Sequence, residues 1–232
     1  MRKLKTLIEQ NRHWAQNVTK KDPNLFIRLA KQQQPKYLWI GCSDSRIPAS
    51  QILGLLPGEL FVHRNIANMM IHSDLSCLSV LQYAVDVLKV RDIIVCGHYD
   101  CGGVKAAMTN TSYGLIDNWL RHIQDVKKKH HELLSYYAGK VTENDVGQND
   151  FLQKQHALMC ELNAIEQATN LTRTSIIQEA WNKGMNVAVH AVMYSVSTGL
   201  LQQLAFAIES SQGAEDFYSQ ALEDIRKHNK IS

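Results

Sequence analysis

The chain of 232 residues is 45% hydrophobic and carries a formal net charge of +3 at neutral pH. Its length suffices for one sizeable core, so we expect a single domain over residues 1–232. The small net charge argues against nucleic acid as a partner, and no run reaches the roughly 18 apolar residues of a membrane span. The N-terminus lacks the apolar segment of a signal peptide, which predicts a cytoplasmic protein with reduced cysteines.

Residues 1–34 are expected to form a helical arm. Apolar residues from Leu4 to Val18 recur at near-helical spacing, which predicts an amphipathic N-terminal helix. Asp22 and Pro23 are typical of an N-cap followed by a first-turn proline, and they predict a second helix that ends near Gln33. Because both helices precede the first strand, they must pack on a structure that already exists. We expect a partner subunit to provide it.

Residues 35–209 are expected to form an α/β core. Short apolar runs at 37–41, 59–64 and 92–97 are typical of buried parallel strands, and a capped apolar stripe predicts a helix at 74–90. This order implies right-handed crossovers and a central, mostly parallel sheet of four to five strands flanked by helices. The remaining predictions are a strand at 186–194, an edge strand at 199–208, helices at 115–138, 151–168 and 173–183, a polar loop at 139–150 and a C-terminal helix within 210–232.

Two of the predicted strands end in residues that can bind a metal. Cys42 begins the sequence CSDSR after the first strand, and His98 and Cys101 belong to GHYDCGG after the third. Open α/β sheets bind ligands beyond the carboxyl ends of their strands, so the three side chains converge if these strands are neighbours. Two thiolates and one imidazole suit zinc, and three protein ligands leave a fourth position open, as in catalytic sites. For the isolated His-x-x-Cys spacing, buried packing cysteines are the competing interpretation.

Asp44 and Arg46 follow the first cysteine closely. Two thiolates cancel the charge of Zn²⁺, so activating a bound water is harder than with three neutral imidazoles. Asp44 can accept a hydrogen bond from a zinc-bound hydroxide, or it can occupy the fourth position itself in a closed form. Arg46 can hold Asp44 in a bidentate pair that keeps the carboxylate ionised and off the metal. A surface ion pair in a turn is the alternative interpretation.

The motifs CSDSR and GHYDCGG, with PGELFVHRNIAN at 57–68 between them, resemble those of the β-class carbonic anhydrases, and of their bacterial branch in particular. The resemblance extends from about Trp14 to Leu201. It implies an enzyme with one Zn²⁺ per subunit that interconverts CO₂ and bicarbonate through attack of zinc-bound hydroxide on CO₂. The zinc ligands and the catalytic pair that it implies are Cys42, His98 and Cys101, with Asp44 and Arg46.

The resemblance also implies a CO₂ pocket and a homodimer or homotetramer. Some residues of this pocket would be donated across a dimer interface, and two glycines would bring backbone amides near the substrate. The residues concerned are Gln33, Phe61, Ile66 and Tyr83, with the glycines Gly102 and Gly103. Ordinary core packing is the competing interpretation for Phe61 and Ile66.

Some bacterial members of the family resemble a regulated type with a non-catalytic bicarbonate site, and Trp39, Arg64 and Tyr194 occupy the matching positions. Arg64 would supply charge, while Trp39 and Tyr194 would donate hydrogen bonds. Bound bicarbonate would compete with the Asp44–Arg46 pair and favour binding of Asp44 to zinc. Lower pH would act in the same direction, because the zinc needs a deprotonated water to bind hydroxide. We therefore expect inhibition by bicarbonate, a closed form near neutral pH and activity that rises at alkaline pH. Core aromatic residues and a structural ion pair are the alternative interpretation.

Two other functions stay open on the sequence. An enzyme on the same scaffold could hydrolyse CS₂ or COS, and access to the pocket would separate the two activities. A non-catalytic zinc protein would carry a further thiolate on the metal, but Asp44 together with Arg46 argues against it. A thioredoxin-like role fails because the sequence has no Cys-x-x-Cys pair. Cys77, Cys96 and Cys160 are expected to be buried packing residues, with Cys96 facing away from the ligands.

Overall fold

A sheet of five strands forms the centre of the computed structural model, which describes residues 2–109, 111–139 and 148–228. The strands follow the order β2-β1-β3-β4-β5, and all neighbours are parallel except β4 and β5. The strands are β1 (Tyr37–Cys42), β2 (Leu60–Asn65), β3 (Asp92–His98), β4 (Ala188–Tyr194) and β5 (Leu201–Gln203). The predicted α/β fold with a mostly parallel central sheet is confirmed.

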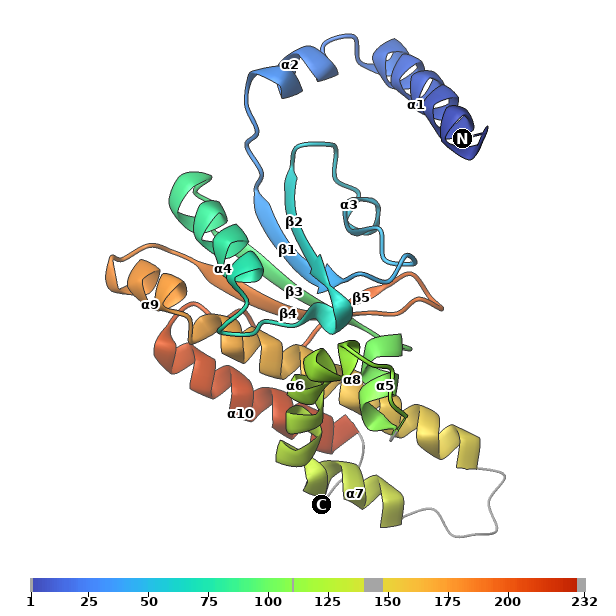
Figure 1. Cartoon of the computed structure of the whole chain (residues 1–232). Coiled ribbons are helices and arrows are strands. Elements are labelled where there is room, and N and C mark those ends of the chain that lie inside the picture. Colours follow the sequence, from blue (N-terminus) through green and yellow to red (C-terminus); the bar gives the residue numbers. More distant parts are fainter. Residues whose placement is uncertain (1, 110, 140–147, 229–232) are drawn as a thin grey trace.

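Helices flank the sheet, and most of them lie on one of its faces (Figure 1). They are α1 (Arg2–Lys21), α2 (Leu25–Lys31), α3 (Ala49–Ile52), α4 (Leu75–Gln82), α5 (Gly102–Met108), α6 (Ile116–Lys129), α7 (His131–Gly139), α8 (Gln148–Thr172), α9 (Ser175–Asn182) and α10 (Ser211–His228), with a 3-10 turn η1 (Ile66–Asn68) and a π-helical turn η2 (Tyr83–Val87). None of the helices within the described ranges is both long enough and apolar enough to cross a lipid bilayer.

The sheet separates two apolar clusters, because successive side chains of a strand point to opposite faces. Leu38, Ile40 and Cys42 of β1 belong to the large cluster under the main helical layer. Trp39 of β1 and Cys96 of β3 belong to a smaller cluster on the other face, beside α3. Cys96 therefore faces away from the predicted ligand cysteines, as expected.

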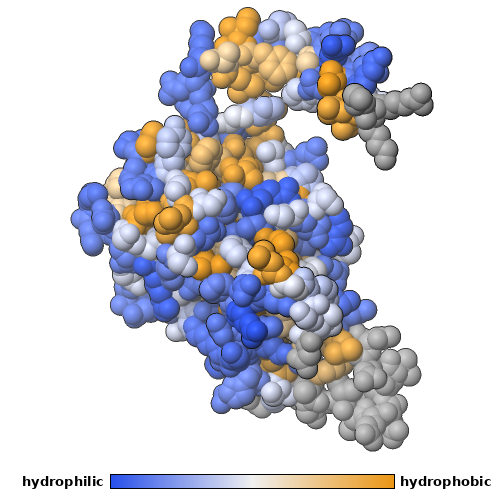
Figure 2. Space-filling view, viewed as in Figure 1, coloured by the Kyte–Doolittle hydropathy of each residue, from blue (hydrophilic) through white to orange (hydrophobic). Residues whose placement is uncertain are grey.

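The N-terminal arm, which consists of α1 and α2, arches away from the body of the chain (Figure 1). Its two helices meet where the rings of Trp14 and Phe26 lie 5.8 Å apart. The apolar side of α1 has no cover within the described chain, since Leu4 is 64% exposed and Leu7 is 59% exposed. Figure 2 shows apolar side chains gathered on this arm and on the body beneath it.

The start of the second arm helix differs from the prediction. Asp22 is not its N-cap, because α2 begins at Leu25. The Asp22 carboxylate instead accepts the backbone N–H of Asn24 at 3.1 Å, and it also pairs with Arg28. These bonds form a turn around Pro23 before the helix begins, so the proline lies outside the helix.

Two other predicted elements are interrupted. The backbone N–H of Leu88 donates to the carbonyl of Tyr83 at 2.9 Å, five residues back, so the helix predicted at 74–90 changes from α to π geometry. The edge strand predicted at 199–208 is short, because Ala205 has a φ of 59°, which a regular strand excludes. Of the loop predicted at 139–150, the first residue closes α7, residues 148–150 open α8, and 140–147 lie outside the described residues.

Candidate metal centre

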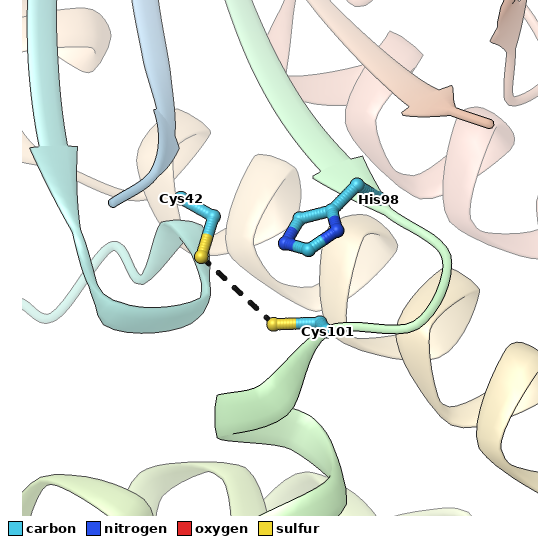
Figure 3. Close-up of side chains that lie close together, drawn as sticks. All are labelled: Cys42, His98 and Cys101. Carbon is cyan, nitrogen blue, oxygen red and sulfur yellow. Dashed lines mark hydrogen bonds between the residues drawn. The ribbon is translucent and has the colours of Figure 1, made fainter. Parts of the chain in front are cut away.

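The three predicted metal ligands lie together at the carboxyl edge of the sheet. Cys42 is the last residue of β1, His98 is the last residue of β3, and Cys101 immediately precedes α5 (Figure 3). Since β1 and β3 are adjacent and parallel, their carboxyl ends share one edge. The ligand atoms all lie within 4.8 Å of one another, with the two sulfurs 3.9 Å apart, and each residue is at most 5% exposed.

The chemistry of this group fits a zinc ion. His98 Nδ1 bonds to the carbonyl of Tyr99 at 2.9 Å, which leaves Nε2 buried and without a partner among the described residues. The hydrogen bond between the two sulfurs lowers the pKa of Cys42, while the same bond and burial raise the pKa of Cys101. Two sulfurs this close share one proton unless a cation compensates their charge. Zn²⁺ suits this donor set and would keep a fourth position open.

Asp44 and Arg46 form the predicted bidentate pair beside this group. Arg46 donates from Nε to Oδ1 at 3.0 Å and from a terminal nitrogen to Oδ2 at 2.7 Å. These bonds lower the pKa of Asp44 to about 2, so the carboxylate is ionised at neutral pH. Oδ2 lies 4.0 Å from His98 Nε2, and Arg46 also donates to the carbonyl of Asp100 at 3.1 Å. The pair thus joins the two ligand-bearing loops and is more than a local turn contact.

The structure divides the predicted CO₂ pocket into two groups. Ile66 and Gly103 belong to the ligand end of the sheet, since a Cβ on Gly103 would lie 2.7 Å from Ile66 Cγ2. A Cβ on Gly102 would meet no atom within 4 Å, so this backbone faces open space. Ile66 is 37% exposed and can offer an apolar wall to that space.

The other predicted pocket residues lie toward the opposite end of the sheet. Gln33 is exposed in the segment before β1. Phe61 pairs with Leu38 near the start of β1, and its ring lies 6.0 Å from the ring of Tyr83. Four residues of strand, about 13 Å at 3.3 Å per residue, separate this row from Cys42. A single chain therefore does not bring Gln33, Phe61 and Tyr83 to its own ligand cluster.

The three residues of the predicted bicarbonate site share one face of the sheet. Trp39 and Tyr194 belong to the smaller apolar cluster. Arg64 is paired with Gly41, which is two residues after Trp39 and therefore faces the same side of the sheet. Arg64 Nε donates to the carbonyl of Cys42 at 2.8 Å, and a terminal nitrogen donates to the carbonyl of Asp44. The guanidinium thereby holds the loop that carries both Cys42 and the Asp44–Arg46 pair.

A second group of possible ligands, His63, Asp74 and Cys77, has a structural explanation. Asp74 caps α4 by accepting the backbone N–H groups of Ser76 and Cys77. Burial raises the pKa of Cys77 to about 12 and lowers that of His63, so both side chains are neutral. Asp74 is the N-cap of α4 and the other two side chains are buried and neutral beside it, so we assign no metal to this group.

The contacts on the other side of Cys42 were not predicted from the sequence. The backbone N–H of Ala67 in η1 donates to Cys42 Sγ at 3.4 Å. Asn163 of α8 donates to the carbonyl of Ala67 at 2.9 Å, and Trp119 of α6 donates to the carbonyl of Ile66 at 2.9 Å. A sequence signal for these contacts was present, because Asn163 is a polar residue within an apolar stretch of the helix predicted at 151–168.

Comparison with known proteins agrees with this geometry. The family description for carbonic anhydrase matches residues 37–201. A carbonic anhydrase of Emericella nidulans is 42% identical over 198 residues, which cover 85% of this chain and 82% of that protein. A β-carbonic anhydrase of Coccomyxa, solved with acetazolamide, has a TM-score of 0.83 at 33% identity and covers 95% of this chain and 96% of its own. A tetrameric β-carbonic anhydrase of Sordaria macrospora has a TM-score of 0.79 at 33% identity, with coverage of 89% and 99%.

The chain therefore belongs to the carbonic anhydrase family and, by its fold, to the β class of these enzymes. This confirms the class that the paired motifs predicted. The relatives named here come from Emericella, Coccomyxa and Sordaria. They give no support to the predicted bacterial branch, which stays a prediction.

Proposed function

We propose that this chain catalyses the reversible hydration of CO₂ to bicarbonate and a proton, with one zinc ion held by Cys42, His98 and Cys101. One observation carries the proposal: three buried ligand atoms within 4.8 Å of one another lie beside a carboxylate that Arg46 holds by two hydrogen bonds. Family membership supports the reaction, and the two sulfur donors and one nitrogen donor support the metal.

When bound, zinc lowers the pKa of water and so supplies a nucleophile at neutral pH. Asp44 accepts a hydrogen bond at Oδ2 from the water that attacks the carbon of CO₂, and it thereby orients this water. Arg46 keeps Asp44 ionised and occupies its Oδ2 with a hydrogen bond of 2.7 Å, which would hold the carboxylate off the metal. Ile66 provides an apolar wall that suits uncharged CO₂. Water and CO₂ combine to bicarbonate, and the released proton passes to solvent.

Stopped-flow measurement of CO₂ hydration on metal-quantified protein tests the proposal. We expect activity that scales with zinc content and disappears in Cys101→Ser. Turnover of COS or CS₂ without turnover of CO₂ would favour the hydrolase alternative. A zinc-loaded protein that converts none of these substrates would favour a non-catalytic zinc protein and overturn the proposal.

We also propose that the active unit is at least a homodimer. The arm exposes a group of apolar side chains, and such exposed groups mark surfaces that bind another protein. The body of a second copy has apolar surface that the arm could cover (Figure 2). Gln33, Phe61 and Tyr83 lie too far from their own Cys42 to complete its pocket, so those of the partner subunit would complete it. The Sordaria relative is tetrameric, which is compatible with a pair of such dimers.

Mixing two inactive variants tests this sharing of residues. Cys101→Ser disables the metal centre of its own chain, and Gln33→Ala disables the pocket of its partner. A mixed dimer contains one site with an intact Cys101 and an intact Gln33, so activity should reappear after the variants are mixed and allowed to exchange subunits. No recovery, with exchange verified by native mass spectrometry, would contradict shared sites.

A second proposal is inhibition by bicarbonate at Trp39, Arg64 and Tyr194, as in the bacterial type that the motifs resemble. Trp39 Nε1 is buried and has no hydrogen-bond partner in the described parts of the chain, so it is available to an anion. An anion that draws Arg64 from the carbonyls of Cys42 and Asp44 would loosen this loop. Asp44 could then leave Arg46 and turn toward the metal.

Inhibition curves with added bicarbonate test this second proposal. We expect Trp39→Phe and Tyr194→Phe to weaken inhibition, because each removes a hydrogen-bond donor and leaves an aromatic ring at the position. Tyr113→Phe, at a 55% exposed position outside the sheet, is the control and should behave as the wild type. Unchanged bicarbonate sensitivity in both test variants would refute the site.

A further inference from the structure

The turn after β2 has an unfavourable backbone conformation. Ala67 and Asn68, consecutive residues of η1, have φ values of 63° and 49°. Residues with a Cβ rarely adopt this left-handed region, and such conformations persist only where the surrounding structure enforces them. Ala67 is fully buried and Asn68 is 1% exposed, so the fold encloses these two residues of the turn.

Two side-chain amides of α8 hold this turn. Asn163 Nδ2 donates to the carbonyl of Ala67 at 2.9 Å, and Gln167 Oε1 accepts the backbone N–H of Met70 at 2.9 Å. Gln167 Nε2 also donates to Asn163 Oδ1 at 3.1 Å. The two residues are four apart and thus share one helix face, and each is 1% exposed. The amide pair Asn163–Gln167 therefore satisfies its own polar atoms through hydrogen bonds to the backbone at Ala67 and Met70 and between its two members.

The residues of this turn also contact the proposed ligand cluster. The N–H of Ala67 donates to Cys42 Sγ at 3.4 Å, and Ile66 lies against the backbone of Gly103, beside Cys101. Trp119 supplies a further bond to the carbonyl of Ile66 at 2.9 Å. The Ala67 N–H shares its peptide plane with the Ile66 carbonyl, and Asn163 holds the next plane through the Ala67 carbonyl. Loss of the Asn163 hydrogen bond would free the backbone to rotate about Ala67, which would move the N–H away from the sulfur and shift the apolar wall.

We propose that Asn163 and Gln167 are positioning residues for the metal centre, because they fix the strained turn that directs the Ala67 N–H at Cys42 Sγ. This inference rests on the zinc site proposed above. A hydrogen bond to a ligating sulfur draws electron density from it, so two thiolates neutralise the metal less completely. The amide pair acts through the turn and touches neither ligand nor substrate.

The test compares zinc-loaded, full-length Asn163→Leu with Thr169→Val. Leucine keeps the approximate size of asparagine and removes the donor to Ala67. Thr169 is also buried on α8, but its hydroxyl donates only to the carbonyl of Ile165 within the same helix, so valine is a matched control. Three readouts are informative: hydrogen exchange of the Ala67 amide, the sulfur-to-cobalt charge-transfer band of the cobalt-substituted protein, and the rate of zinc release to a chelator.

For Asn163→Leu we expect faster exchange at Ala67 by about tenfold or more, a shifted charge-transfer band, and zinc release faster by about 10–100-fold. Thr169→Val should remain within about twofold of the wild type. Wild-type values in a folded Asn163→Leu, or equal changes in Thr169→Val, would overturn the inference. A wild-type protein without stoichiometric zinc would instead overturn the proposed function.

Two measurements keep the inference testable if Asn163→Leu does not fold. Gln167→Met removes the acceptor for the Met70 N–H and leaves Asn163 in place, so smaller changes in the same directions are expected. In the wild type, the Ala67 amide should exchange as slowly as the amides of β1 and β3, because the turn is held as firmly as the core. Exchange of Ala67 at the rate of an exposed loop amide would overturn the inference without any variant.

Discussion

The buried carboxylate of Glu166 gives a prediction of stability that can be worked from its contacts. Its side chain is 6% exposed and accepts hydrogen bonds from His130 Nε2 at 2.7 Å, Tyr218 Oη at 2.7 Å and Lys129 Nζ at 2.9 Å. These donors join the α6–α7 junction and α10 to α8. Burial raises the pKa of Glu166, but the three hydrogen bonds outweigh it and lower the pKa from 4.5 to about 2.

The magnitude follows from linkage between protonation and folding. At about 1.4 kcal/mol per pKa unit, and with a reduction because Lys129 is 46% exposed, Glu166 contributes about 2–3 kcal/mol at neutral pH. Because the pKa is lower in the folded state, this stability is fully present above about pH 4.5 and is lost as the pH falls toward 2. Removing the charge by Glu166→Gln should therefore be destabilising at neutral pH.

Guanidinium denaturation of the zinc-loaded protein at pH 7.5, at one fixed protein concentration, measures this effect. Glu166→Gln should lose about 2–3 kcal/mol, and the difference from wild type should narrow below pH 4.5. Glu179→Gln is the matched control, because Glu179 is 64% exposed and its pair with Lys183 is worth less than about 1 kcal/mol. Equal losses in the two variants would show that the buried hydrogen bonds of Glu166 add no stability beyond that of an exposed ion pair.

Three further changes have defined outcomes. Gly103→Ala places a methyl group 2.7 Å from Ile66 Cγ2, so it should cost about 1–3 kcal/mol in denaturation and lower kcat/KM; full stability would show that the turn can yield. Asp44→Asn should lower kcat/KM by about 10²–10⁴-fold with unchanged zinc content by elemental analysis, whereas metal loss would make Asp44 a required ligand. Trp14→Ser removes an apolar side chain that is 49% exposed in one chain, so light scattering should show the oligomer dissociating at a higher protein concentration than in the wild type. An unchanged mass at every concentration would place Trp14 outside the interface.

The convergence of Cys42 and His98 could be predicted because their positions follow from local patterns. Short apolar runs predicted β1 and β3, and parallel strands expose their carboxyl ends at one edge, so Cys42 and His98 had to lie at that edge. The central position of β1 between β2 and β3 could not be predicted in this way. Strand order depends on which faces the later helices cover, and no local pattern records it.

The residues around the ligands were harder to find for a similar reason. Asn163 and Gln167 are polar, and a polar residue in a helix is expected at the surface until the facing segment is known. Their role depends on the turn at Ala67, which lies almost a hundred positions earlier in the chain. The displaced start of α2 has a local cause, since Asp22 satisfies a turn instead of a helix end.

X-ray absorption at the zinc edge of the purified protein reports the donor atoms of the proposed metal centre. We expect one zinc per chain with two sulfur and one imidazole nitrogen ligands and a fourth light-atom position that solvent can occupy. Replacement of Cys101 by serine should remove one sulfur from the spectrum or remove the metal altogether. A wild-type spectrum with three or more sulfurs, or a preparation without stoichiometric zinc, would rule out this metal centre.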